Sequence, residues 1–146
     1  EKIVLDSGGV VVRLSNIFGR GMVSGTVMSD IIKQIPGSGS LRVRDDRPIR
    51  DFLPVSETTS AFGCIIESNY SGVLNVGSGI GTSINALARL FLETVGQEDR
   101  DIIATQPSSK ISVNILDISE TIKVTGWLPD FSLKKQLSQL LIVEQG

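Results

Sequence analysis

The sequence predicts an α/β fold in which only part of a parallel β-sheet is present. Two apolar runs rich in β-branched residues, Val10 to Leu14 and Val73 to Val76, have the composition of buried strands. Segments in which apolar residues recur at helical spacing follow each run, and strands that alternate with helices favour parallel pairing. Because two parallel strands alone make a poor sheet, we expect the missing strands to lie upstream of Glu1.

The first third of the chain predicts two helical segments and two extended ones besides the first strand. The opening EKIVLDS is typical of the last turns of a helix, which two glycines then end. Apolar residues at helical spacing predict a second helix around Gly25 to Ile35. Leu41 to Arg44 and Ile49 to Leu53 resemble short extended segments, and the DDRP turn between them indicates a hairpin.

A helix is predicted over Val55 to Glu67, with Ser56 available as its N-cap. Its predicted apolar face consists of Val55, Thr59, Phe62 and Ile66. Cys64 lies in the stretch Ala61 to Ile66 and is expected to serve as a small buried hydrophobe.

The second half predicts a strongly amphipathic helix after GSGIGTS at Gly77 to Ser83, capped by Thr82 or Ser83. The apolar face of that helix consists of Ile84, Leu87, Ala88, Phe91 and Val95. Three shorter elements follow: a strand at Ile102 to Ala104, a helix at Ser119 to Val124 and a terminal helix at Ser132 to Leu141.

Composition excludes several classes of function. The chain has 146 residues, 40% of them hydrophobic and 21% charged, which fits one globular domain. A net charge of −2 and a pI near 5.1 argue against nucleic-acid binding. No apolar run approaches the roughly 18 residues of a membrane span, and the opening has no signal-peptide pattern, so we expect a cytoplasmic protein without membrane contact.

The chain has one cysteine and no histidine. This composition excludes disulfides within the chain, metal sites made of Cys and His, and nucleophiles activated by histidine. The carboxylates Glu98, Asp99 and Asp101 crowd a loop without apolar neighbours, so they predict a solvated turn and not paired acid–base catalysis.

Polar side chains follow the first strand in VVVRLSNIFGRG, at Val10 to Gly21. Ligands of open α/β sheets sit at the carboxyl ends of the strands, so Arg13 and Asn16 stand where binding groups are useful. Asn16 is either a side-chain donor to a ligand or a turn residue that bonds its own backbone.

Four arginines lie within nine residues, at positions 42, 44, 47 and 50. Arginine is suited to bidentate phosphate contacts. Arg50 is the strongest candidate, because it lies in an alternating apolar segment and is followed by Asp51, which could hold the guanidinium in place. The other three lie beside Asp45 and Asp46 and are expected on a solvated hairpin.

Two other segments have competing interpretations. The glycines of GSGIGT are compatible with a dinucleotide-binding turn, but Thr82 stands where a third glycine belongs, so a capped helix start is the better interpretation. Trp127 could stack on a sugar or base, but a lone Trp between two helices favours a place in the core.

Four segments together resemble the extended short-chain dehydrogenase/reductase family: RLSNIFGRG at Arg13 to Gly21, IRDFLPV at Ile49 to Val55, GVLNVGSG at Gly72 to Gly79 and GWLP at Gly126 to Pro129. In order and spacing they are similar to the carboxyl-terminal part of an NAD-dependent nucleotide-sugar epimerase/dehydratase. The resemblance implies an α/β fold with the last strands of a Rossmann-like parallel sheet, from residues 1–24 and 69–83. Residues 25–68 and 84–146 would mainly form a small mixed α/β substrate-binding lobe and covering helices, and the fold would be incomplete without an upstream half.

The resemblance also implies roles for particular residues. Asn16 would contact the phosphate or sugar of a nucleotide-diphospho-sugar substrate, Arg50 would bind its pyrophosphate, and Asp51 would support Arg50. The backbone near Leu14 and Ser15 would border the nicotinamide of NAD or NADP, which the upstream half would mainly bind. Arg13 has no comparable role and is expected in a structural ion pair.

The sequence departs from the family at three places. Neither the glycine-rich cofactor loop nor a Tyr-xxx-Lys pair is present, because Leu74 stands four positions after the only tyrosine, Tyr70. Glu57 replaces an aspartate that is usual after the RDF motif. A second substrate arginine is often found where this chain has Gln106, Pro107 or Ser108.

The resemblance therefore implies a complete enzyme that transiently oxidises a sugar carbon with NAD, of which this chain is the substrate-binding part. By itself the chain would bind weakly and contain no catalytic residue. The alternative is a non-catalytic member of the same fold that senses a nucleotide or binds a protein. A homodimer, where one forms, would use upstream helices.

Overall fold

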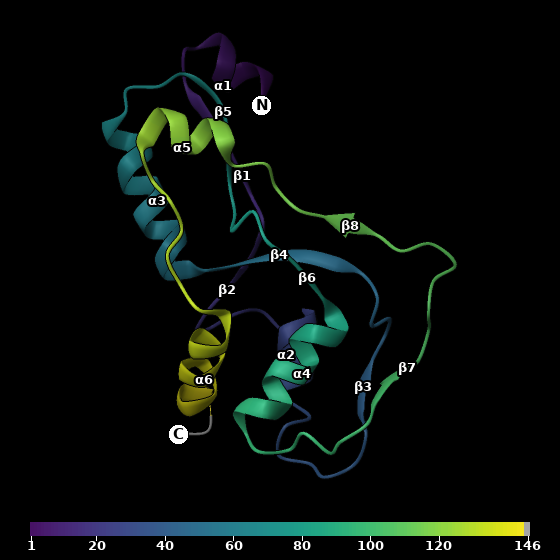
Figure 1. The fold of residues 1–146 in the computed structure, drawn as a ribbon. Coiled ribbons are helices and arrows are strands. Elements are labelled where there is room, and N and C mark those ends of the chain that lie inside the picture. The colour runs from purple at the N-terminus through teal and green to yellow at the C-terminus, as the bar shows by residue number, and fades with distance from the viewer. Residues whose placement is uncertain (145–146) are drawn as a thin grey trace.

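The computed structural model describes residues 1–144, and its α/β fold confirms the predicted class. In chain order the elements are α1 (Lys2–Asp6), β1 (Val10–Leu14), β2 (Asn16–Phe18), α2 (Val27–Ile32), β3 (Leu41–Val43), β4 (Ile49–Pro54), α3 (Val55–Glu67), β5 (Gly72–Val76), β6 (Gly81–Ser83), α4 (Ile84–Thr94), β7 (Ile102–Ala104), β8 (Val113–Asn114), α5 (Ser119–Thr125) and α6 (Leu133–Glu144). Figure 1 shows α3 and α5 beside β1 and β5 in the upper half, α2, α4 and α6 in the lower half, and β4 between the two.

The two predicted strands pair with each other. β1 and β5 run parallel, with Val10 opposite Gly72 and Leu14 opposite Val76. α3 and α5 pack around this pair and enclose a core that we call the sheet core. Its buried members are Leu53, Ala61, Ile65, Leu74, Val76 and Trp127, and Cys64 packs partly buried against them. α3 and α5, which belong to the ranges 25–68 and 84–146, thus cover the β1–β5 pair.

A second core, the lobe core, lies between α2, α4, α6 and the short β3–β7 pair. The predicted face of α4 contributes Ile84, Leu87, Ala88 and Phe91, all buried, and this prediction is confirmed. Ser83 caps α4, because its Oγ accepts a hydrogen bond from the amide of Ala86 at 3.1 Å. The GSGIGTS segment therefore begins a capped helix.

β4 is the strand that connects the two halves. Its second half pairs in parallel with β2, so that Asn16 lies opposite Phe52. Its first half pairs antiparallel with β6 and in parallel with β8, so that Arg50 lies between Thr82 and Asn114. The central position of β4 fixes the backbone on which Arg50 and Asp51 stand.

Two local predictions are wrong. The segments predicted as a hairpin, β3 and β4, do not pair with each other; β3 pairs with β7, and β4 pairs with β2, β6 and β8. The later strands supply partners that local sequence does not reveal. The N-cap of α3 is Pro54, which offers no side-chain bond, and Ser56 lies inside the helix.

The predicted apolar face of α3 points outward. Val55 and Ile66 have 51% and 77% of their surface exposed, and Phe62 is also exposed. The neighbouring face, about a quarter turn away, carries Thr58, Ala61 and Ile65 and is buried. The small side chains of Thr58 and Ala61 allow the helix to approach the strands closely.

Within residues 1–144, no helix combines the length and apolar character needed to cross a bilayer.

Candidate functional site

β2 and β4 bring Asn16 and Arg50 to one cavity of about 540 Å³. Asn16 begins β2, and its Nδ2 donates a hydrogen bond to the carbonyl oxygen of Asp51 at 3.1 Å. Because Asp51 follows Arg50 on β4, this bond fixes the Asn16 side chain next to the arginine. Asn16 is exposed and Arg50 is half-buried. Two residues that the sequence singled out separately thus line the same cavity.

Arg50 keeps part of its guanidinium free. Its Nη1 donates to the carbonyl oxygens of Ile49, at 2.8 Å, and Ser112, at 2.9 Å. These bonds hold one edge of the group, while Nε and Nη2 bond to no described residue. The fixed orientation leaves donors available for an anion.

Arg44 is solvent-exposed as expected, although β3 and β4 form no hairpin, and it also lines this cavity. It is exposed, and among residues 1–144 its side chain has no hydrogen-bond partner or ion pair. Its carbonyl oxygen accepts a bond from the amide of Gln106 at 2.7 Å, which brings Gln106 to the cavity wall. Two guanidinium groups that line one cavity favour a ligand with more than one negative charge.

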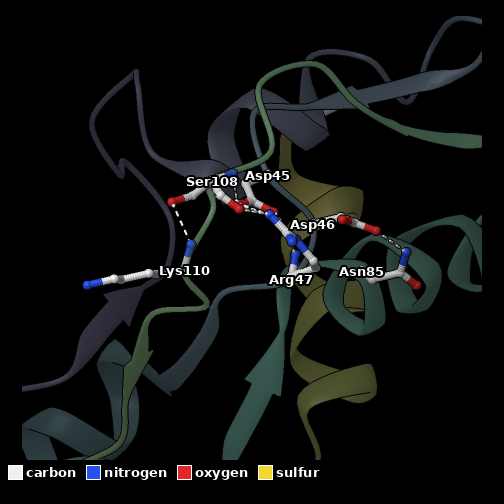
Figure 2. Close-up of polar contacts among 6 residues, drawn as sticks. All are labelled: Asp45, Asp46, Arg47, Asn85, Ser108 and Lys110. Carbon is white, nitrogen blue, oxygen red and sulfur yellow. Dashed lines mark hydrogen bonds and ion pairs between the residues drawn. The ribbon is translucent and has the colours of Figure 1, made fainter.

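Arg47 does not contribute a free cation, because it pairs with Asp45 (Figure 2). Its Nε lies 3.1 Å from Asp45 Oδ1 and its Nη2 lies 3.2 Å from Oδ2. The amide of Ser108 also donates to Asp45 Oδ2, at 2.7 Å, and Arg47 Nη2 donates to the Ser108 carbonyl. The Arg47 guanidinium, followed by the Ser108 amide, lowers the pKa of Asp45 well below its usual range.

Asp51 has a role different from the expected one. Alternation along β4 turns its side chain away from that of Arg50, so the predicted direct contact between the two is absent. The buried carboxylate accepts instead from Ser78, by its amide at 2.7 Å and its hydroxyl at 2.6 Å. It also accepts from the amides of Gly79, at 3.1 Å, and Leu116, at 3.3 Å. Asp51 therefore joins β4 to the turn after β5 and to the segment after β8.

Gly77 permits this junction. A Cβ atom at this position would lie 2.5 Å from Asp51 Oδ2 and 3.2 Å from the Cβ of Ser15. The GSG segment is thus required for a close approach to a carboxylate. Sequence reasoning identified the glycines but missed Ser78, Gly79 and Leu116 as partners of Asp51.

A second cavity, of about 400 Å³, adjoins the first and shares Asn16 and Val27 with it. Its wall is mostly apolar and includes Met22 and Phe52. Ser15 lines it as well, and the Ser15 Oγ is buried without a hydrogen-bond partner among the described residues. The site therefore consists of a cationic cavity and an apolar one, with Asn16 at the boundary.

Three other candidates lie outside this site. Arg13 forms an ion pair with Glu1 at 2.7 Å, as expected of a structural residue. Trp127 is buried in the sheet core, which confirms its interpretation as a core residue. Leu14 ends β1 with 46% of its surface exposed.

Comparison with known proteins identifies chains of similar sequence and similar fold. A search of family models finds no match. Among curated proteins, "Putative GDP-L-fucose synthase 2" of Arabidopsis thaliana is 36% identical over 106 residues, which cover 70% of this chain and 29% of that protein. The chain spans only about a third of the length of the curated relatives it matches.

Solved structures superpose on nearly the whole chain. RMD from Pseudomonas aeruginosa in complex with NADPH has a TM-score of 0.88 and 24% identity, and the match covers 97% of this chain and 52% of that one. UDP-glucose 4-epimerase from Thermotoga maritima with UDP-glucose has a TM-score of 0.82 and 25% identity, covering 94% and 46%. These comparisons confirm the predicted resemblance.

Proposed function

We propose that this chain, which has the fold of the carboxyl-terminal part of NAD-dependent nucleotide-sugar epimerases/dehydratases, is the substrate-binding part of such an enzyme. The observation that carries the proposal is the shared cavity of Asn16 and Arg50, with Arg44 on its wall. A diphosphate needs several donors and positive charge, and this cavity offers both.

In the proposed complex, the pyrophosphate lies against Arg50 and Asn16. The free Nε and Nη2 of Arg50 face the phosphate oxygens, while the bonds to Ile49 and Ser112 keep the guanidinium oriented. Arg44 contributes a second cation toward the nucleotide. Arg47 is already paired with Asp45 and takes no part in phosphate binding.

The apolar cavity is suited to the sugar. Its walls offer Met22 and Phe52 for the carbon face of a hexose, and Ser15 and Asn16 for hydroxyl groups. The nicotinamide of NAD or NADP would border Leu14 and Ser15; the unpartnered Ser15 Oγ and the exposed Leu14 side chain are compatible with such a neighbour. A bound nicotinamide supplies a hydride acceptor for the sugar carbon.

In this proposal the present residues bind and orient the substrate, and other residues of a complete enzyme supply proton transfer. Solved structures of similar fold are complexes with NADPH, NAD or UDP-glucose.

Calorimetric titration with UDP, GDP and dTDP tests the phosphate site. A charge-assisted hydrogen bond contributes about 1.5–3 kcal/mol, so Arg50→Ala should weaken binding by about one to two powers of ten. Arg42→Ala is the matched control, because Arg42 is exposed on β3 and does not line this cavity. Equal affinities of the wild type and Arg50→Ala would refute the site, as would a wild type that binds none of the three.

A further inference from the structure

The segment between β7 and α5, residues 105–118, forms an arm along the outside of the lobe (Figure 1). Gln106 and Ser108 from this arm line the cationic cavity. Every residue from 105 to 115 is exposed, whereas Leu116 is half-buried and Ile118 is buried at the end of the arm. The position of residues 105–115 therefore depends mainly on polar bonds to the rest of the chain.

Backbone hydrogen bonds hold the arm at two points. Gln106 bonds to the carbonyl of Arg44 at 2.7 Å, and Ser112 accepts from the amide of Ile49 at 2.9 Å. Between these points, the bonds from the arm to the body of the lobe run through Ser108. Its amide and its carbonyl both engage the ion pair of Asp45 and Arg47 (Figure 2).

We propose that Asp45 and Arg47 are positioning residues that hold the arm as a wall of the nucleotide-binding cavity. This inference rests on the proposed function of that cavity. Neither side chain needs to touch the phosphates, because both act through Ser108, which lines the same cavity as Arg50.

The ion pair also compensates the negative charge of Asp45. A free carboxylate at position 45 would repel a diphosphate, because Asp45 lies on the cavity wall. The bidentate contact with Arg47 compensates its charge, and the carboxylate gains the Ser108 amide as a further donor. Asp45 can therefore hold the arm in place while it repels an anionic ligand only weakly.

The neighbouring Asp46 provides a charge-matched control. Its Oδ2 accepts from Asn85 Nδ2 at 2.8 Å, and its carbonyl accepts from the amide of Asn85 at 2.7 Å. These contacts lead to the start of α4 and not to the arm (Figure 2). Asp45→Asn and Asp46→Asn thus remove the same charge from the same loop, but only the first weakens the hold on Ser108.

The test measures the dissociation constants of UDP, GDP and dTDP for the wild type, Asp45→Asn and Asp46→Asn. We expect Asp45→Asn to weaken binding about tenfold, which corresponds to about 1.4 kcal/mol. Asp46→Asn should bind as tightly as the wild type or more tightly, since it removes a negative charge near the ligand. If Asp45→Asn binds at least as tightly as the wild type, or if both variants lose the same affinity, the proposal is wrong.

Hydrogen exchange measures the hold on the arm directly. The Ser108 amide should exchange faster in Asp45→Asn than in the wild type, and at an unchanged rate in Asp46→Asn. An unchanged Ser108 rate in Asp45→Asn would also overturn the proposal. If Asp45→Asn does not fold, Arg47→Gln supplies the second variant, with the Ser108 exchange rate as its readout, because the uncompensated Asp45 carboxylate would by itself weaken nucleotide binding. A wild type that binds no nucleotide would contradict the proposed function. A wild type that binds nucleotide, together with an Asp45→Asn variant of equal affinity, would contradict this inference alone.

Discussion

Replacing Asp51 by Asn should strongly destabilise the chain although the two side chains have nearly the same shape. Each carboxylate oxygen accepts two hydrogen bonds, from Ser78 at Oδ1 and from Gly79 and Leu116 at Oδ2. An amide offers one acceptor oxygen, so its NH2 group must face two N–H or O–H donors. Hydrogen bonds to a charged group contribute about 1.5–3 kcal/mol each, and losing two predicts a cost of about 3–6 kcal/mol.

Urea unfolding of the chain provides the assay, with the fluorescence of Trp127 as the signal. Trp127 is 5% exposed in the sheet core, so its emission should report loss of that core. Asp99→Asn is the control: Asp99 is exposed in a loop, and the same chemical change there should alter the free energy of unfolding by no more than about 0.5 kcal/mol. A free energy of unfolding for Asp51→Asn within about 1 kcal/mol of the wild type would refute the role given to the carboxylate.

Two further predictions concern the same region. Gly77→Ala should lower the free energy of unfolding by about 1–3 kcal/mol, because its Cβ would lie 2.5 Å from Asp51 Oδ2, whereas Gly39→Ala, with open space around it, should have little effect in the same urea assay. Asp45 has a lowered pKa, so its contribution to stability is complete above about pH 4 and is lost as the pH falls through that lowered value. The difference in free energy of unfolding between the wild type and Asp45→Asn should therefore shrink between about pH 6 and about pH 3; a constant or growing difference would contradict the ion pair.

The sequence predicted those features whose signal is local. The strands β1 and β5 are continuous apolar runs, and α4 has an apolar stripe that matches its buried face. Asn16 was identified from its place at a strand end, and Arg50 from its place in an alternating segment. Their meeting on one cavity depends on the pairing of β2 with β4, which local sequence does not encode.

The features that sequence reasoning missed depend on distant partners. β2, β6 and β8 have two or three residues each, too few to establish an alternating pattern. The face of α3 was misassigned because Phe62 and Ile66 are more hydrophobic than the buried Ala61. The expected support of Arg50 by Asp51 was inferred from adjacency, but neighbouring residues of a strand point to opposite sides.

The binding of a nucleoside diphosphate between Asn16 and Arg50 can be measured most directly by nuclear magnetic resonance. In nitrogen-15-labelled protein, titration with UDP, GDP or dTDP should shift the side-chain Nδ2 signals of Asn16 and the Nε signal of Arg50 with a common saturation curve. The Nε signal of Arg13, which pairs with Glu1 outside the cavity, should stay in place. Saturable binding that leaves the Asn16 and Arg50 signals unmoved, or no binding at millimolar nucleotide, would contradict the assignment of this cavity to a nucleotide sugar.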